Sequence, residues 1–233
     1  MTKARASVYI VTGGVLILLL LGGFSLYAKK NQKQASKTPI PHTSTTPTEI
    51  PNTPPNPTNN TQQMTNASPF TPPLNRAKER VTKKPFGIHI SPTNSPVSPE
   101  KFTGIHTATD FETFPEEANT DVPVMTICSG PLLRKQQARG YGGMVVQACT
   151  LNDNPITVVY GHLQLASINW VVGNQLAQGT TLGILGKGYS PETDGERKHL
   201  HLGVHTGSQV VTNGYIANQA DLHNWLDVMQ YIQ

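Results

Sequence analysis

The sequence predicts an all-β fold, an antiparallel β-sandwich or barrel-like hybrid, with an N-terminal transmembrane helix and a short C-terminal helix. Apolar runs rich in β-branched residues occupy residues 122–128, 143–150 and 156–160. The turn-forming sequence Asn-Asp-Asn-Pro at residues 152–155 separates two of these runs. Short runs of this kind, divided by Gly, Pro and Asn, are typical of sandwiches and barrels.

Composition divides the 233 residues into a membrane anchor over residues 1–30, a disordered linker over 31–84 and a folded domain over 85–233. The formal net charge of +4 comes from the first two regions. Residues 85–233 contain seven Lys and Arg against twelve Asp and Glu, a net charge of −5 with His neutral. A nucleic-acid partner is therefore not expected, because it calls for a basic patch on the domain itself.

Residues 8–28 form an uncharged and mostly apolar stretch of 21 residues. A helix needs about 20 such residues to span a bilayer, so we expect an uncleaved membrane anchor. A cleaved signal peptide is the alternative. Its apolar region is usually shorter, and Leu-Tyr-Ala at residues 26–28 is a poor small-x-small cleavage site.

The linker decides the expected orientation. Four Lys follow the apolar stretch, against one Lys and one Arg before it, and this count alone would place the domain in the cytoplasm. Residues 38–75, however, are dense in Pro, Thr, Asn and Ser and cannot bury a core. An extended spacer of this kind, followed by a charged hinge at residues 76–84, would let the folded domain extend away from the membrane within the cell envelope. We therefore expect the domain outside the cytoplasm, or secreted if the anchor is cleaved.

Two further expectations concern the folded domain. Cys128 and Cys149 belong to no Cys-x-x-Cys motif, and neighbouring strands would bring them within reach of a disulfide in an exported protein. Apolar residues recur with helical spacing near the C-terminus, at positions 222, 225, 226 and 229. This period predicts one short amphipathic helix packed on the sheet.

His199 and His201 lie in the extended stretch 198–205. Alternate side chains of a strand share a face, so the two imidazoles project together, as a metal site or a proton-transfer site requires. A His-x-His pair alone also occurs on exposed strands. The interpretation depends on the partners that the rest of the chain supplies.

His106 and Asp110 are the first candidate partners. Their spacing of four residues places both side chains on one face of a strand, as two zinc donors or as an ordinary surface pair. With His201 they make three protein ligands and leave the fourth position of a catalytic zinc site open. His162 follows the apolar run 156–160 directly, at the end of a predicted strand.

Five short segments occur in the order found in the M23 family of lysostaphin/LytM-type zinc metalloendopeptidases, which the chain resembles. The segments are residues 104–111, 123–130, 140–143, 160–163 and 199–201. Between the last two, residues 172–176 and 183–186 resemble a hairpin of the family. The resemblance covers about residues 86–210 and leaves the anchor and the linker outside.

The resemblance implies an M23-type peptidase domain. His106, Asp110 and His201 correspond to the zinc ligands, and His162 and His199 to the catalytic pair. It also implies a peptidoglycan substrate, with hydrolysis of peptide bonds in cross-bridges or stem peptides.

The chain departs from the family pattern at three places. Glu196, Arg197 and Lys198 stand where a Gly-Pro usually precedes the His-x-His, and Gly203 stands where an acidic residue is common. The loop at residues 189–198 is also unusual for the family. The three departures concern substrate preference more than the metal site.

Two other classes of function are open on the sequence. A non-catalytic envelope module of the same fold would bind peptidoglycan or activate a partner hydrolase, and it would tolerate loss of His162 or His199. A structural or carrier β domain with incidental His would bind no stoichiometric zinc.

Overall fold

Asn152 and Asp153 make the tight turn that joins strands β6 (Gly142–Leu151) and β7 (Asn154–Gly161) in the computed structural model. Both residues have positive φ, 49° and 64°, as two-residue hairpin turns require and as Asn and Asp tolerate. The structure describes residues 68–233. The anchor predicted at residues 8–28 lies outside them, and within them no helix is long and apolar enough to cross a membrane.

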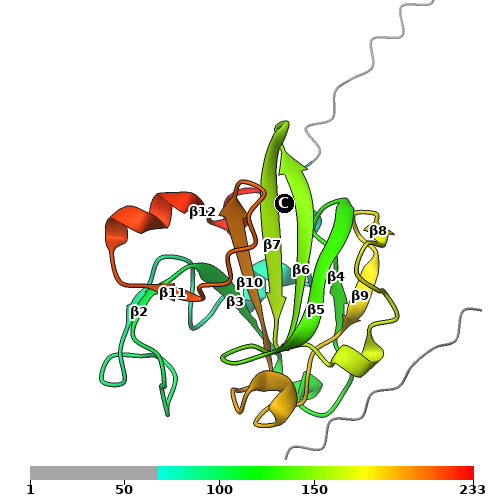
Figure 1. Ribbon diagram of the computed structural model, residues 1–233. Coiled ribbons are helices and arrows are strands. Elements are labelled where there is room, and N and C mark those ends of the chain that lie inside the picture. Colours follow the sequence, from blue (N-terminus) through cyan, green and yellow to red (C-terminus); the bar gives the residue numbers. More distant parts are fainter. Residues whose placement is uncertain (1–67) are drawn as a thin grey trace, which may run out of the picture. The chain divides into compact units, whose positions relative to one another are not determined.

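A seven-stranded sheet forms the centre of the domain (Figure 1). Its strands follow the order β12-β10-β7-β6-β5-β8, and β3 also pairs with β10; every pairing is antiparallel. The other strands of this sheet are β3 (Ala108–Glu112), β5 (Gly130–Ala138), β8 (Gln175–Leu176), β10 (His199–Thr206) and β12 (Trp225–Leu226).

The remaining strands form two smaller antiparallel sheets. One has the order β1-β2-β11, with β1 (His89–Ile90), β2 (Gly104–His106) and β11 (Tyr215–Ile216). The other pairs β4 (Pro123–Met125) with β9 (Thr181–Ile184). Strand β8 pairs with β5 and β9 with β4, so the two segments that resemble a family hairpin do not pair with each other.

The helices of the described residues are all short 3-10 helices. They are η1 (Ala77–Arg80), η2 (Pro115–Glu117), η3 (Leu165–Ser167), η4 (Pro191–Thr193), η5 (Gln219–Asn224) and η6 (Val228–Gln230). The all-β prediction is therefore confirmed for the described part of the chain.

Strand β10 positions the candidate site because it pairs with β3 and with β7. His201 lies opposite Asp110 of β3 and opposite Gly161 of β7. Three apolar residues of β10, Leu200, Leu202 and Val204, are at most 1% exposed and belong to the main core. Strand alternation then turns His199 and His201 to the opposite face.

Residues 68–84, assigned above to the linker and the hinge, pack into the domain instead. Phe70 and Leu74 are each 1% exposed and belong to the main core. Phe70 also forms a β-bridge with Ile232, near the C-terminus. Arg80 is only 2% exposed. Its charge can be buried because it pairs with Glu117, with 2.6 Å between Nη1 and Oε2. Long-range partners therefore order a segment whose composition alone predicts a spacer.

The predicted C-terminal amphipathic helix is wrong. Trp225 and Leu226 form strand β12 between helices η5 and η6, and β12 pairs with Val204 and His205 of β10. Figure 1 shows this red segment returning to the edge of the central sheet. The sheet edge satisfies backbone groups that a helix would have satisfied internally, so tertiary pairing overrides the helical period.

Cys128 and Cys149 form a disulfide, with a Cα–Cα distance of 6.1 Å and a sequence separation of 21 residues. It joins the segment after β4 to strand β6. Gln147 donates a hydrogen bond from Nε2 to the Cys128 carbonyl at 3.0 Å, beside the bond. This pairing fulfils the expectation from the sequence.

The disulfide yields the first prediction. Thiol titration of the unfolded, unreduced protein is expected to detect no free thiol, and two per chain after reduction. The double substitution Cys128→Ser, Cys149→Ser is expected to lower the free energy of unfolding by about 3 kcal/mol, because the bond closes a loop of this length in the unfolded chain. Two free thiols in the native protein would contradict the bond.

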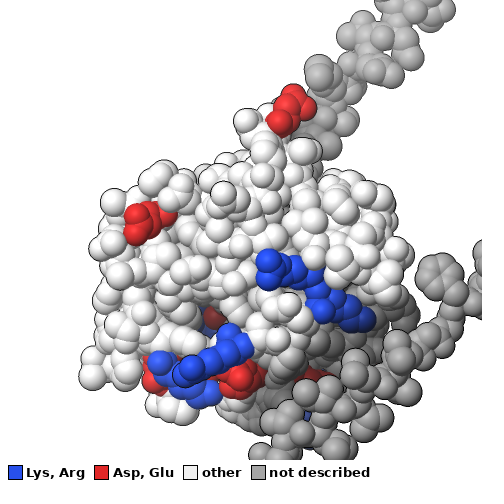
Figure 2. All heavy atoms as spheres, viewed as in Figure 1, with Lys and Arg blue, Asp and Glu red and all other residues white. Residues whose placement is uncertain are grey.

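Charges of both signs occur on the described domain. Residues 68–233 contain twelve Lys and Arg and thirteen Asp and Glu. Figure 2 shows one face on which blue and red side chains lie in small groups separated by uncharged surface.

Candidate metal centre

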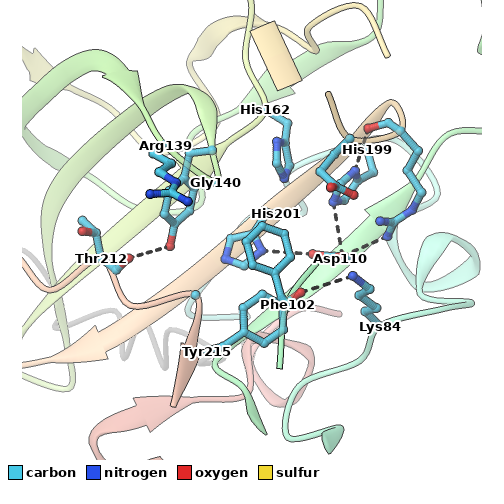
Figure 3. A pocket seen from close by; sticks show the side chains of 14 residues that line it. Lys84, Phe102, Asp110, Arg139, Gly140, His162, His199, His201, Thr212 and Tyr215 are labelled. Atoms are coloured by element: carbon cyan, nitrogen blue, oxygen red, sulfur yellow. Dashed lines mark hydrogen bonds and ion pairs between the residues drawn. The ribbon is translucent and has the colours of Figure 1, made fainter. Parts of the chain in front are cut away.

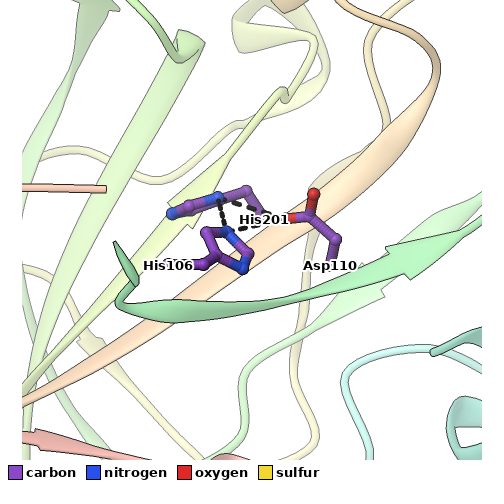
Figure 4. Close-up of side chains that lie close together, drawn as sticks. All are labelled: His106, Asp110 and His201. Carbon is purple, nitrogen blue, oxygen red and sulfur yellow. Dashed lines mark hydrogen bonds and ion pairs between the residues drawn. The ribbon is translucent and has the colours of Figure 1, made fainter. Parts of the chain in front are cut away.

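Three side chains from three strands converge in the interior: His106 at the end of β2, Asp110 in β3 and His201 in β10 (Figure 4). Asp110 Oδ1 lies 3.2 Å from His201 Nδ1 and 3.4 Å from His106 Nε2. The two ring nitrogens are themselves 3.2 Å apart. All three residues are at most 5% exposed, so the predicted grouping is present and buried.

The donor set fits a zinc ion. Asp110 Oδ1 is buried and accepts no hydrogen bond, so one carboxylate oxygen is available to a cation. His106 Nδ1 lies 3.3 Å from the Pro85 carbonyl, and a proton held there leaves Nε2 as a lone pair towards the other two donors. Two imidazoles and one carboxylate are one of the three-ligand sets found in catalytic zinc sites.

The protonation states of Asp110 and His201 also favour metal binding. Burial would raise the pKa of Asp110, but His199 and His106 beside it hold that pKa well below its usual range. Burial lowers the pKa of His201 to about 4, against the attraction of Asp110. Both residues are therefore unprotonated at neutral pH, which is the form that ligates a metal.

His162 and His199 lie beside this cluster, with ring centroids 4.3 Å apart. His162 follows β7 and has φ of +65°, a left-handed conformation that is uncommon outside glycine and is often found at functional sites. Its amide donates to the Tyr141 carbonyl at 2.9 Å. Its Nδ1 is buried without a partner. Burial, followed by the neighbouring His199 and His201, lowers the pKa of His162 well below its usual value.

Both ring nitrogens of His199 face oxygen atoms. Nδ1 lies 2.9 Å from the Arg197 carbonyl and Nε2 lies 3.2 Å from Asp110 Oδ2. Each of these oxygens can accept a hydrogen bond from the ring nitrogen that faces it, so the ring is fixed next to the candidate metal ligands.

A cavity of about 260 Å³ opens onto Asp110, His162, His199 and His201 (Figure 3). Aromatic side chains form part of its wall. Tyr141 donates from its hydroxyl to the Thr212 carbonyl at 2.9 Å and meets the His201 ring edge-on at 5.2 Å. Tyr215 stacks on His106 and on Phe102, each at a centroid distance of 5.1 Å.

Sequence reasoning missed several residues of this wall. Lys84, predicted as part of a hinge, is 2% exposed, and its Nζ lies 2.6 Å from Glu100 Oε2. Tyr141 belongs to a segment that carried the resemblance but was assigned no role. Arg197, noted only as a departure from the family pattern, contacts Asp110 directly at 2.9 Å. For Arg197, this departure from the family pattern was the only signal in the sequence.

The other His residues do not line this cavity. His205 continues β10 and packs against Trp225 at a centroid distance of 4.8 Å. His89 and His223 also lie away from its wall, and His42 is outside the described residues.

Known proteins resemble part of this chain. A curated relative, Endolysin 2638A of Staphylococcus phage 2638A, is 37% identical over 100 residues, which are 42% of this chain and 18% of the relative. The chain thus spans less than a fifth of that protein.

Solved structures resemble part of the chain at lower identity. The catalytic domain of lysostaphin from Staphylococcus simulans is 19% identical, with a TM-score of 0.41 over 64% of this chain and 86% of that one. LytU is 18% identical, with a TM-score of 0.43 over 65% and 83%. A zinc-containing peptidase from Vibrio cholerae is 20% identical, with a TM-score of 0.38 over 59% and 36%.

The family model of peptidase family M23 matches residues 104–213. This range contains His106 and the four cavity-lining residues Asp110, His162, His199 and His201; His106 joins two of them in the candidate metal site. Residues 104–213 of the chain thus match the model of peptidase family M23, and the resemblance found in the sequence is confirmed.

Proposed function

We propose that the protein is a membrane-tethered zinc endopeptidase that hydrolyses peptide bonds in peptidoglycan cross-bridges or stem peptides. The observation that carries the proposal is the convergence of two imidazoles and a carboxylate beside a second pair of imidazoles. The match to the model of a peptidase family supports the reaction class. The relative named as an endolysin suggests the substrate.

The envelope location rests on two features of the chain. The disulfide between Cys128 and Cys149 favours an oxidising compartment. The apolar stretch at residues 8–28 has the length of a membrane anchor. Both features support a domain that is tethered in the cell envelope.

Each residue of the site has a distinct task in peptide hydrolysis. His106, Asp110 and His201 would hold a zinc ion, which would supply Lewis acidity towards the peptide carbonyl and make water a better nucleophile at neutral pH. His162 and His199 accept the proton of the attacking water and return it to the leaving amine nitrogen. The carbon–oxygen bond forms, the carbon–nitrogen bond breaks, and a new amino group results.

Release of amino groups tests the function. Purified full-length protein is expected to generate free amino groups from isolated peptidoglycan without generating new reducing sugar ends. A zinc chelator should abolish the release, and one equivalent of zinc should restore it, because the ion is needed for water activation. Comparison of glycine-bridged peptides with D-amino-acid stem peptides would assign the bond.

The same assay separates the two classes of function. If the zinc-loaded protein binds peptidoglycan but releases no amino groups, the chain is a non-catalytic envelope module and the endopeptidase proposal fails. If the protein holds no stoichiometric zinc by elemental analysis, the metal site itself is wrong.

A further inference from the structure

Arg197 lies between two acidic side chains at the wall of the cavity. Its Nη2 is 2.9 Å from Asp110 Oδ2. Its Nε is 2.8 Å from Glu112 Oε2, and Nη2 also contacts Glu112 Oε1. Arg197 is 6% exposed, Glu112 8% and Asp110 1%. The guanidinium therefore bridges the candidate metal ligand and a second carboxylate within the protein interior.

The strand geometry brings these three groups together. Asp110 and Glu112 are two residues apart in β3, so their side chains share a face. The pairing of β3 with β10 places His199 opposite Glu112 and His201 opposite Asp110. Arg197 precedes β10 by two residues and thus lies next to both carboxylates. The planar fork of an arginine can serve both at once, which a lysine cannot.

The two oxygens of Asp110 have different surroundings. Oδ2 accepts a hydrogen bond from Arg197 and faces His199 Nε2 at 3.2 Å. Oδ1 accepts none and lies between the nitrogens of His106 and His201. A fixed hydrogen bond at Oδ2 keeps the carboxylate from turning, so a single oxygen is presented to the metal position.

We propose that Arg197 is a positioning residue for the metal ligand Asp110, and that Glu112 is the counter-charge that permits this role. Without Glu112, the full charge of Arg197 would draw electron density from Asp110 and repel a cation beside it. With Glu112, which also faces Lys83 Nζ at 3.5 Å, the charge of Arg197 is shared by two carboxylates, and Asp110 keeps its donor strength. This inference rests on the zinc site of the proposed function.

Metal affinity tests the inference independently of catalysis. In purified full-length protein, the zinc dissociation constant of wild type, Arg197→Lys and Glu112→Gln is measured by competition with a chromophoric chelator. The absorption spectrum of the cobalt-substituted protein reports the coordination geometry. Loss of the bridging hydrogen bonds in Arg197→Lys is expected to raise the zinc dissociation constant about 10- to 100-fold and to change the cobalt spectrum. Glu112→Gln is expected to raise the constant about 10-fold.

Arg80→Lys is the matched control. Arg80 is also buried and also binds a glutamate through two hydrogen bonds, Nη1 to Glu117 Oε2 at 2.6 Å and Nη2 to Oε1 at 2.7 Å. It also donates from Nη1 to the Glu112 backbone carbonyl at 3.1 Å, but it reaches neither the Glu112 carboxylate nor a candidate metal ligand. A loss of stability without a role at the metal would therefore affect Arg80→Lys in the same way. Its dissociation constant and cobalt spectrum are expected to match those of wild type.

The outcomes separate this inference from the proposed function. If wild type binds no zinc, the metal site fails and the inference fails with it. If wild type binds zinc and both Arg197→Lys and Glu112→Gln match it in affinity and cobalt spectrum, only the positioning role is overturned. Should Arg197→Lys not fold, Glu112→Gln alone decides, because it preserves the volume and one acceptor oxygen.

Discussion

Replacing His201 with Ala is expected to leave a folded protein that holds no stoichiometric zinc and releases no amino groups from peptidoglycan. The substitution removes one of the three donors and leaves Asp110 and His106 without the nitrogen that completes the set. For wild type, zinc at about a hundred times its dissociation constant should stabilise the fold by about 2.7 kcal/mol. The variant should gain none of this stabilisation.

Elemental analysis and thermal unfolding with and without zinc measure both effects. His205→Ala is the matched control, because His205 lies in the same strand four residues further on and packs against Trp225 outside the cavity. It should bind zinc as wild type does. One zinc per chain in His201→Ala would show that the ligand assignment is wrong.

Replacing His199 with Ala is expected to preserve zinc binding and to lower kcat about 10²- to 10⁴-fold, the usual contribution of a general acid or base. His199 contacts Asp110 Oδ2 and the ring of His162 but is not one of the three converging donors. Its loss should therefore remove proton transfer and leave the metal in place. The measurement is the rate of amino-group release at equal zinc content.

The double variant distinguishes one proton-transfer unit from two independent residues. If His162 and His199 act together, removing both costs little more in kcat than removing the more important one. His223→Ala, which alters an imidazole outside the cavity, should retain the wild-type rate. A wild-type rate in His199→Ala would eliminate the catalytic role and favour the non-catalytic module.

Local patterns predicted much of the central sheet. The apolar runs at residues 122–128, 143–150 and 156–160 overlap β4, β6 and β7. They could be recognised because β-branched residues and turn residues act over a few positions. The His-x-His alternation of β10 follows from the same two-residue period.

Two predictions are wrong because pairing between distant segments decides the structure there. The apolar period at positions 222–229 favours a helix, but Trp225 and Leu226 form a strand that pairs with the edge of β10. Residues 68–84 have the composition of a spacer, yet Phe70 and Leu74 fill the core. In both cases the deciding partner lies far away in the chain, where no local pattern can reveal it.

The amino-acid sequence by itself determined the order of the strands' apolar runs, the residue types of the donor set and the two cysteines of the disulfide. Only the tertiary structure decided which oxygen of Asp110 faces the two imidazoles, because Arg197 and Glu112 meet that carboxylate through the pairing of β3 with β10. Donor chemistry is a property of individual residues. Donor orientation depends on contacts between segments almost a hundred residues apart, and those contacts exist only in the folded chain.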